Sequence, residues 1–272
     1  MKKIVLFLTL ILFIITLSGC QSLNVISEYL YNDKDYEIGN KAYDPSVYNI
    51  ETIEVDWIVG NVYILQSSNH EIIIREETDI EIEDKFKMHY KLEDNTLDIK
   101  FAKSCNLLEY KYKIKNLYIF LPSQINEITI NNVSSDISIN YVNIKDLEIN
   151  NVSGDIVIED ATIDELQINN VSGEIIILDD EINSVEIDTT SGDLGMSFLK
   201  MPHELNISST SANITLYILN TDIVSIEFET ISGKLESNLQ YTKNEDTYVF
   251  NGKLDDNYEV ETVSGSLVIN KK

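Results

Sequence analysis

The sequence is poor in proline, cysteine, tryptophan and basic residues. Its 272 residues include three Pro, two Cys, one Trp and one Arg, and only 20 Lys and Arg stand against 46 Asp and Glu. Two cysteines, Cys20 and Cys105, cannot build a disulfide framework. A formal net charge of −26 repels nucleic acid phosphates and anionic lipid surfaces, and this excludes a nucleic-acid-binding protein.

The residues that are abundant favour β-structure. Isoleucine occurs 41 times, hydrophobic residues make up 43% of the chain, and most aromatic residues are Tyr. This composition is typical of a folded β-rich chain and excludes an acidic disordered one. A length of 272 residues suits one or two domains with a sizeable core.

The first twenty residues predict where the protein resides. Lys2 and Lys3 precede an unbroken run of apolar residues and Thr from 4 to 17. This run is too short to span a bilayer of roughly 30 Å, but it fits the hydrophobic part of a secretory signal. The following Leu17-Ser18-Gly19-Cys20 resembles a bacterial lipobox. The resemblance implies that 1–19 is a lipoprotein signal peptide and that Cys20 is lipidated. An ordinary signal peptide or a chance cysteine is the alternative.

A lipidated Cys20 would make the protein a cell membrane lipoprotein on the extracytoplasmic face, because two or three acyl chains hold a protein on a membrane durably. Loss of the leader would change the formal net charge from −26 to −28. Residues 20–46 are polar and Tyr-rich with no clean period. We interpret them as the lipidated N-terminus and a tether to the membrane; a short helix is the alternative.

An internal repeat organises the rest of the chain. The segment Val133-Ser134-Ser135-Asp136-Ile137 recurs as Val152-Ser153-Gly154-Asp155-Ile156, as Val171-Ser172-Gly173-Glu174-Ile175 and as Thr190-Ser191-Gly192-Asp193-Leu194, with a step of 19 each time. Weaker copies follow at Ser211, Ser232 and Ser264, so the later steps are 20, 21 and 32. An early copy is proposed at Val59-Gly60-Asn61-Val62.

Each repeat holds two runs of alternating apolar residues separated by a bend that contains Ser-Gly. Such a unit buries its apolar face only when stacked on its neighbours at about 4.8 Å. The sequence therefore predicts an all-β fold, a single-stranded β-helix or β-solenoid built from coils of about 19 residues. Seven or eight coils would give a rod of roughly 35–40 Å. Two internal columns are expected, one of Ile149, Ile168 and Ile187 and the other of Ile156, Ile175 and Leu194.

The two ends of the rod are less regular. Residues 47–120 are β-rich and supply either the first coils or an N-terminal cap, with a hairpin at Glu93-Asp94-Asn95. The β-solenoid repeats are expected from 121 to 272. A hairpin insertion is expected near 236–257, where it could cover the open C-terminal end. One continuous body is favoured over two independent domains.

The V-S-G-D-I-x-I units, the Leu121-Pro122 that precedes them and the lipobox together resemble the bacterial putative-adhesin β-strand repeat family. The resemblance covers about 50–270. It implies a β-strand repeat fold in an envelope protein, and it carries no catalytic residues over to this chain.

Stacking places Asp136, Asp155, Glu174 and Asp193 in one acidic ladder at the corner. The interpretation is a solvated ladder, with bridging by Ca²⁺ as the alternative. Asparagines also recur at a step of 19 and are expected to hydrogen-bond along the rod. These are Asn131, Asn150 and Asn169, each followed by a second Asn. The N-x-S/T sequons at Asn132, Asn151, Asn170, Asn206 and Asn213 are interpreted as a by-product of the repeat.

No catalytic, cofactor-binding or metal-ligating residues are predicted. His70, His89 and His203 lack metal-ligand spacing, and Cys105 has no neighbouring His that would make it a reactive thiol. A polysaccharide-active β-helix enzyme is the weakest alternative. Trp57 and Arg75 are the single Trp and Arg that could hold a sugar or an acidic substrate.

These observations predict a lipid-anchored extracytoplasmic β-solenoid that acts as a non-catalytic adhesion or interaction scaffold at the bacterial cell envelope. Its partners would be the membrane, through Cys20, and an envelope protein, a glycan or a cationic peptide. The second hypothesis is an envelope-stress or signalling accessory that binds cationic peptides through its acidic faces.

Overall fold

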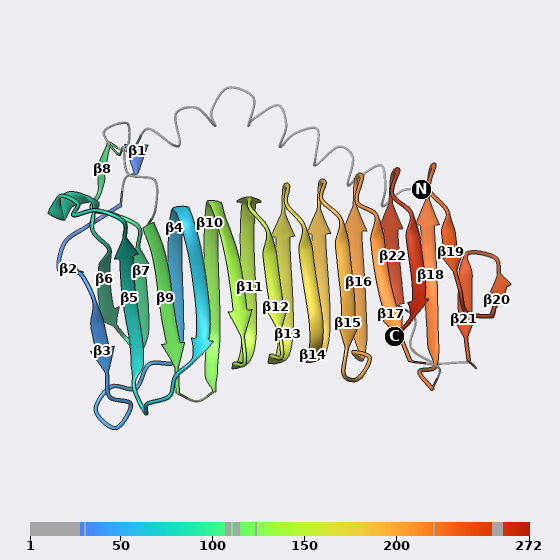
Figure 1. The fold of residues 1–272 in the computed structure, drawn as a ribbon, viewed down its shortest axis with the longest axis horizontal. Coiled ribbons are helices and arrows are strands. Elements are labelled where there is room, and N and C mark those ends of the chain that lie inside the picture. The colour runs from blue at the N-terminus through green and yellow to red at the C-terminus, as the bar shows by residue number, and fades with distance from the viewer. Residues whose placement is uncertain are drawn as a thin grey trace.

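The computed structural model describes residues 28–29, 31–106, 110, 115–122, 124–219, 221–251 and 258–272. The fold of these residues is all-β, with one short 3₁₀ turn, η1 (Asp84–Phe86). None of them forms a helix with the length and apolar character needed to span a bilayer. The predicted leader and Cys20 lie outside the described residues. Every described strand except β1 and β8 belongs to one sheet that runs the length of an elongated body (Figure 1).

The middle of the body is a stack of parallel strands in which residue i pairs with residue i+19. Ile125 pairs with Ile144, and Ile163 pairs with Ile182. We call each strand–corner–strand unit a rung. The strands of these rungs are β10 (Ile125–Asn140), β11 (Asn143–Ser153), β12 (Ile156–Glu159), β13 (Thr162–Asn170) and β14 (Ile175–Thr189). Alternate residues point inward, so the isoleucines of the repeat form a core between the two walls of the stack.

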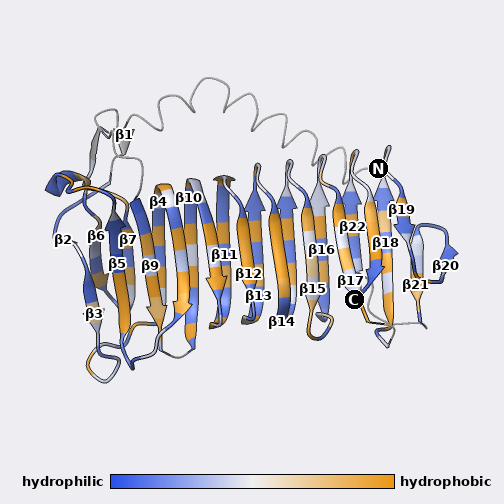
Figure 2. Ribbon diagram, viewed as in Figure 1, coloured by the Kyte–Doolittle hydropathy of each residue, from blue (hydrophilic) through white to orange (hydrophobic). Residues whose placement is uncertain are grey.

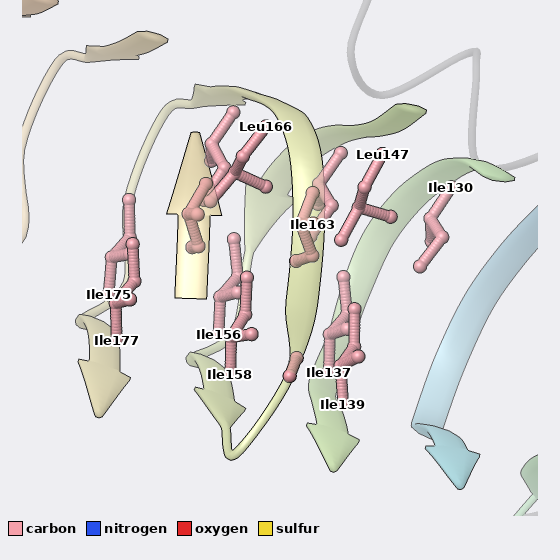
Figure 3. Packing of buried hydrophobic residues seen from close by; sticks show 14 of the residues in the cluster. Ile130, Ile137, Ile139, Leu147, Ile156, Ile158, Ile163, Leu166, Ile175 and Ile177 are labelled. Atoms are coloured by element: carbon pink, nitrogen blue, oxygen red, sulfur yellow. The ribbon is translucent and has the colours of Figure 1, made fainter. Parts of the chain in front are cut away.

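Both expected columns are confirmed. Ile149 pairs with Ile168, Ile168 pairs with Ile187, and all three are fully buried. In the second column, Ile156 pairs with Ile175, which pairs with Leu194. Figure 3 shows Ile137, Ile156 and Ile175 side by side on successive rungs. The bands of apolar residues repeat from strand to strand along the body (Figure 2).

The rungs toward the C-terminus are not stacked in the order of the sequence. The penultimate and last repeats exchange places: Asn206 pairs with Glu259, and Glu259 pairs with Glu227. The last rung therefore lies between two earlier ones, and the prediction that successive turns pile up in order is wrong here. The strands concerned are β15 (Leu194–Phe198), β16 (Glu204–Ser209), β17 (Ile214–Ile218), β18 (Val224–Thr230), β19 (Leu235–Ser237), β22 (Tyr258–Thr262) and β23 (Leu267–Lys271).

A hairpin explains this exchange. Strands β20 (Tyr241–Asn244) and β21 (Thr247–Phe250) lie within the insertion expected near 236–257, and they pair with each other antiparallel. Strand β21 also pairs antiparallel with the outer edge of β18, from Val224 to Glu227. Because the outer edge of β18 is occupied, β22 pairs with its inner edge. The hairpin thus covers the end of the body, as predicted, but the rung it covers is 224–237.

The N-terminal end of the body is also covered by strands that pair antiparallel. Strand β4 (Thr52–Gln66) pairs in parallel with β10 on one side, and with β7 (Thr96–Lys100) and β9 (Lys115–Leu121) on the other. The early repeat is confirmed, because Gly60 pairs with Ser135 and Asn61 pairs with Asp136. Strands β6 (His89–Glu93) and β7 form the expected hairpin, with Asp94 and Asn95 at positive φ.

The cap also takes in residues that were expected to form a tether. Strand β2 (Glu37–Ile38) pairs with β6, and β3 (Lys41–Tyr43) pairs with β5 (Ile72–Thr78), which itself pairs antiparallel with β9. The Tyr31 hydroxyl donates a hydrogen bond to the carbonyl of Ala102. Strands β1 (Glu28–Tyr29) and β8 (Cys105–Asn106) form a separate pair. The aromatic residues of 31–46 pack on the cap, and this contradicts a tether over that stretch.

Candidate functional site

The repeated Ser-Gly corner holds neighbouring rungs very close together. Gly154, Gly173 and Gly192 have φ between 109° and 122°, a region that L side chains rarely adopt. A Cβ on Gly173 would lie 2.1 Å from the carbonyl oxygen of Gly154. The preceding serine locks the corner, because the Ser172 hydroxyl donates to the carbonyl of Val152 on the rung before it. The V-S-G motif therefore fixes the spacing of the rungs.

The second Asn of each pair forms a buried ladder behind this corner. Asn132 Nδ2 donates to Asn151 Oδ1 at 2.6 Å, Asn151 Nδ2 donates to Asn170 Oδ1 at 2.8 Å, and Asn170 Nδ2 donates to Thr189 Oγ1 at 3.1 Å. Each amide also donates to a carbonyl of its own corner, as Asn151 does to Gly154. These sequon asparagines are structural and have no room for a glycan, since each is at most 5% exposed.

We expect Asn151→Ala to lower the free energy of unfolding by about 3 kcal/mol, because it leaves the carbonyl of Gly154 and the amide oxygen of Asn170 buried without their donors. Asn150→Ala is the matched control, since that side chain is only half-buried and should cost under about 1 kcal/mol. Urea unfolding of both variants measures the difference. Equal losses would contradict a special role for the inner ladder.

The outer ladders are confirmed as well. Asn150 Nδ2 donates to Asn131 Oδ1 at 3.1 Å, and Asn169 Nδ2 donates to Asn150 Oδ1 at 3.0 Å. The exposed acidic ladder has a bonding role that the sequence analysis missed. Asp136 Oδ1 accepts the backbone N–H of Asp155 at 2.9 Å, and Asp155 Oδ1 accepts that of Glu174 at 2.8 Å. Within the described part of the chain, no group of three or more His, Cys, Asp or Glu is arranged to hold a metal ion.

The strands before the corner present an acidic face. Its outward positions carry many carboxylates, and the register places them side by side. The lysine in these strands is the exposed Lys145, which forms an ion pair with the neighbouring Asp146 at 3.0 Å. A shallow hollow of about 170 Å³ lies in its middle, lined by Glu127, Asp146, Glu148, Glu165 and Glu186 together with smaller polar and apolar side chains. We call the surface formed by the outward residues of β10 before the corner, β11, β13, β14 from 182 onward and β16 the acidic face.

The strands after the corner present a very different surface. One outward row runs from end to end of the body: Arg75, Tyr118, Tyr63, Ser138, Val157, Ile176, Gly195, Thr215, Val268 and Glu236. Only its two terminal residues are charged. The row beside it holds Phe120, Leu65, Asn140, Glu159, Leu178, Ser197, Tyr217 and Asn270, with Glu159 as its one carboxylate. We call these two rows the neutral face.

One carboxylate is buried within β14, away from the Ser-Gly corner. Asp180 is fully buried; its Oδ1 accepts the N–H of Ala161 at 2.5 Å, and its Oδ2 has no hydrogen-bond partner. Desolvation by burial raises the pKa of Asp180 from 3.8 to about 7, with a smaller contribution from the neighbouring Asp160 and Asp179.

The raised pKa of Asp180 should make the stability of the protein depend on pH. Between pH 4 and 7 the folded chain keeps a proton on Asp180 that the unfolded chain has released, so the free energy of unfolding falls as the pH rises through this interval. The difference in pKa corresponds to at most roughly 4 kcal/mol, and we expect about 2 because the site relaxes when it ionises.

The comparison with Asp180→Asn isolates this effect from other carboxylates. At pH 7.5 the Asp180→Asn variant should be more stable than the wild type by about 2 kcal/mol, and at pH 4 the two should be equal. The exposed Asp164→Asn variant serves as control. Urea unfolding at both pH values measures the difference, and parallel pH profiles of the wild type and Asp180→Asn would contradict it.

The other candidate residues do not come together. Trp57 is fully buried, and its Nε1 donates to the carbonyl of Lys115 at 3.1 Å, so it offers no platform to a sugar. Arg75 is exposed and lies over the rings of Tyr118 and Phe120. His70 and His203 are exposed, whereas His89 is buried in the cap. Cys105 lies in β8, and its side chain is outside the described features.

A comparison of the sequence with known protein families agrees with this fold. The family model described as Toastrack DUF4097 matches residues 50–270, which include the middle rungs and both end rungs. The chain belongs to the Toastrack DUF4097 family. The sequence matches none of the curated proteins significantly.

Solved structures extend the comparison of this Toastrack chain. A putative adhesin from Bacteroides fragilis NCTC 9343 is 15% identical, with a TM-score of 0.52 over 87% of this chain and 97% of that chain. A putative adhesin from Parabacteroides merdae ATCC 43184 is 12% identical, with a TM-score of 0.44 over 87% and 96%. A putative lipid binding protein from Parabacteroides distasonis ATCC 8503 is 16% identical, with a TM-score of 0.44 over 86% and 97%. At these identities the first likeness concerns the fold alone.

Proposed function

We propose that this Toastrack protein is a lipid-anchored, extracytoplasmic β-solenoid with coils of about 19 residues, and that it acts as a non-catalytic adhesion or interaction scaffold at the bacterial cell envelope. The observation that carries the proposal is the pair of long ladder-bearing faces, one acidic and one neutral, built by the i to i+19 register. A rigid stack with continuous faces can hold a partner along its length without a deep pocket.

The membrane location rests on the lipobox at Leu17-Ser18-Gly19-Cys20. A single acyl chain binds a membrane reversibly, whereas the two or three chains of a lipoprotein anchor it durably. The carboxylates repel anionic lipid headgroups, so the folded body should stand off the membrane surface while the N-terminus holds it there.

We expect Cys20→Ala to abolish lipid attachment and to release the protein from the membrane fraction, because the thiol that would carry the lipid is gone. Labelling with a radioactive or clickable fatty acid, followed by fractionation, measures both effects. Cys105→Ala is the matched control, because it removes the other cysteine of the chain and should keep both label and location. Label on Cys20→Ala, or a wild type free in the cytoplasm, would contradict the anchor.

Binding to cell envelopes tests the scaffold. Fluorescently labelled protein of residues 21–272, which contains every described residue, should bind intact envelopes in a saturable way. The binding should be competed by the unlabelled chain. Turnover of neutral or acidic polysaccharides by the same preparation would favour the enzyme alternative instead.

The acidic face supports a second candidate, binding of cationic peptides. Its carboxylates create a negative field that strengthens at low ionic strength. The triple variant Glu148→Gln, Glu165→Gln and Glu186→Gln should weaken the binding of a Lys-rich peptide and flatten its salt dependence. A control with Glu159→Gln changes the neutral face. Binding that ignores both salt and the triple variant would exclude this candidate.

A further inference from the structure

The neutral face is a sheet surface of low charge on a strongly acidic molecule. Val157, Ile176, Thr215 and Val268 are half-buried on neighbouring rungs, and Leu178 and Tyr217 beside them are 37% and 38% exposed. A second copy carries the same net charge and the same acidic face, so two copies approach at lower electrostatic cost through the neutral face than through the acidic face.

The charges at the ends of this face set an orientation. At the cap end, Arg75 terminates the central row, and Glu77 lies beside it opposite Asn116. At the other end, Glu236 terminates the same row. Lys234 lies beside Glu236, because its backbone N–H reaches Ser266 and its carbonyl accepts the N–H of Leu267. All four side chains are exposed. Lys234 and Glu236 also pair with each other, an exposed contact of little energetic weight.

We propose that the neutral face binds a second copy of this chain, face to face and with the two rods antiparallel. This inference rests on the proposed function and names its partner. A two-fold axis across the rods brings Arg75 opposite Glu236 and Glu77 opposite Lys234, and does so twice in each dimer. A parallel arrangement would place Arg75 opposite Arg75.

The uncharged part of the central row fits the same arrangement. Ten residues occupy the row, so the axis falls between the fifth and the sixth, Val157 and Ile176, which then pack on each other across the interface. Toward the ends, Gly195 faces Ser138, Thr215 faces Tyr63, and Val268 faces Tyr118. The large aromatic residues of one copy thus meet small or β-branched residues of the other, as close sheet-on-sheet packing requires.

The glycan alternative fits this face less well. The rings of Tyr63 and Tyr118 stack on each other with centroids 4.7 Å apart, and Arg75 covers the next position. One face of each ring is therefore covered by the other ring, and Arg75 covers the second face of Tyr118, so Tyr118 cannot stack on a sugar.

The size of the face predicts a weak dimer. Nine spacings of about 4.8 Å and two outward rows give on the order of 500–600 Å² per copy, near the lower bound of specific interfaces. The corner carboxylates Asp136, Asp155, Glu174 and Asp193 border the face and oppose their counterparts at the rim. The association should therefore be of micromolar affinity or weaker, and it should tighten as salt screens this repulsion.

Sedimentation of residues 21–272 tests the interface. The wild type should show a concentration-dependent dimer that strengthens with added salt. Ile176→Glu places two like charges at the centre of the interface and should weaken the dimer at least about 100-fold. Gln167→Glu on the acidic face is the matched control and should change the affinity by less than about twofold. Circular dichroism and thermal unfolding verify that both variants fold.

A charge swap tests the orientation. Arg75→Glu should weaken the dimer about tenfold, because it turns two attractive pairs into repulsive ones. The double variant Arg75→Glu with Glu236→Arg should restore most of the affinity, since the pair is recreated in reverse. A dimer that survives Ile176→Glu, or a wild type that stays monomeric at every accessible concentration, would overturn the interface. Failure of the swap to restore the affinity would overturn the antiparallel register.

These outcomes can be separated from failure of the proposed function. A monomeric chain that is lipid-labelled and binds envelopes leaves the scaffold in place and removes only the second copy as its partner. A dimeric chain that carries no label on Cys20 and binds no envelope keeps the dimer and removes the scaffold.

Discussion

Replacing Gly173 by Ala should lower the free energy of unfolding by about 4 kcal/mol or more. The backbone of Gly173 has φ of +122°, and its missing Cβ faces the carbonyl of the rung below at 2.1 Å. A strained φ costs about 1–3 kcal/mol, and overpacking adds about 1–3 kcal/mol when the neighbour cannot move. Here the neighbour is the backbone of Gly154, which is itself held by the next rung.

Gly195→Ala is the matched control within the same stack. Its Cβ would meet nothing within 4 Å, and its φ is not positive. A methyl group there should be neutral or slightly stabilising, because it reduces the freedom of the unfolded chain. Urea unfolding of the two variants measures the contrast. A small effect at Gly173 would mean that the rungs can separate at the corner without a large loss of stability.

The sequence could predict the interior of the middle rungs because there the pattern and the structure share one period. Ile149, Ile168 and Ile187 lie in one column, and the Asn pairs hydrogen-bond along the stack as expected. The strict alternation of apolar and polar residues predicted which residues point inward. The constant step of 19 predicted which residues lie above one another.

The order of the rungs at the two ends could not be predicted in the same way. A parallel ladder needs matching edges and matching inward residues, and it does not require that its strands be consecutive in the chain. The repeats around Ser232 and Ser264 have the same pattern, so either could have come first. The occupied edge of β18 decides the order, and this depends on the hairpin that follows it.

The difference in charge between the two faces could not be predicted from the sequence, for a related reason. The sequence predicted acidic faces from the recurring carboxylates and did not predict a neutral one. The outward residues of the two strands of a rung nevertheless differ, as Glu148 and Val157 do on one rung. Separating them requires knowing where each strand begins and ends at the corner. The carboxylate of Asp155 that accepts the N–H of Glu174 was missed because such a bond joins two rungs.

One lysine in the core was also overlooked, although its position in the sequence gives a signal. Strand β9 alternates inward and outward residues, and Lys115 has the same parity as Leu117 and Ile119. It is fully buried, and its Nζ forms an ion pair with Glu76 Oε2 at 2.8 Å. The ammonium also donates to the carbonyls of Phe86 and Phe101. Lys115 thus joins β9 to three segments of the N-terminal cap, at Glu76, Phe86 and Phe101.

Lys115→Ala should therefore lower the free energy of unfolding by about 4 kcal/mol or more. Removing one partner of a buried ion pair leaves an uncompensated charge, which costs about 3–5 kcal/mol, and here it also leaves two carbonyls without their donor. Lys91→Ala is the control, because Lys91 pairs with the exposed Glu93 and should cost less than about 1 kcal/mol.

A double-mutant cycle separates the charge from the packing. Lys115→Met keeps most of the side-chain volume and leaves Glu76 charged, so it should be nearly as unstable as Lys115→Ala. Adding Glu76→Gln removes the buried charge while an amide can still accept the N–H of Met88, which now donates to Glu76 at 2.6 Å. The double variant should recover about 2 kcal/mol relative to Lys115→Met. If Glu76→Gln adds its cost in full to that of Lys115→Met, the pair is not coupled, and the lysine acts on the cap through its hydrogen bonds to Phe86 and Phe101 alone.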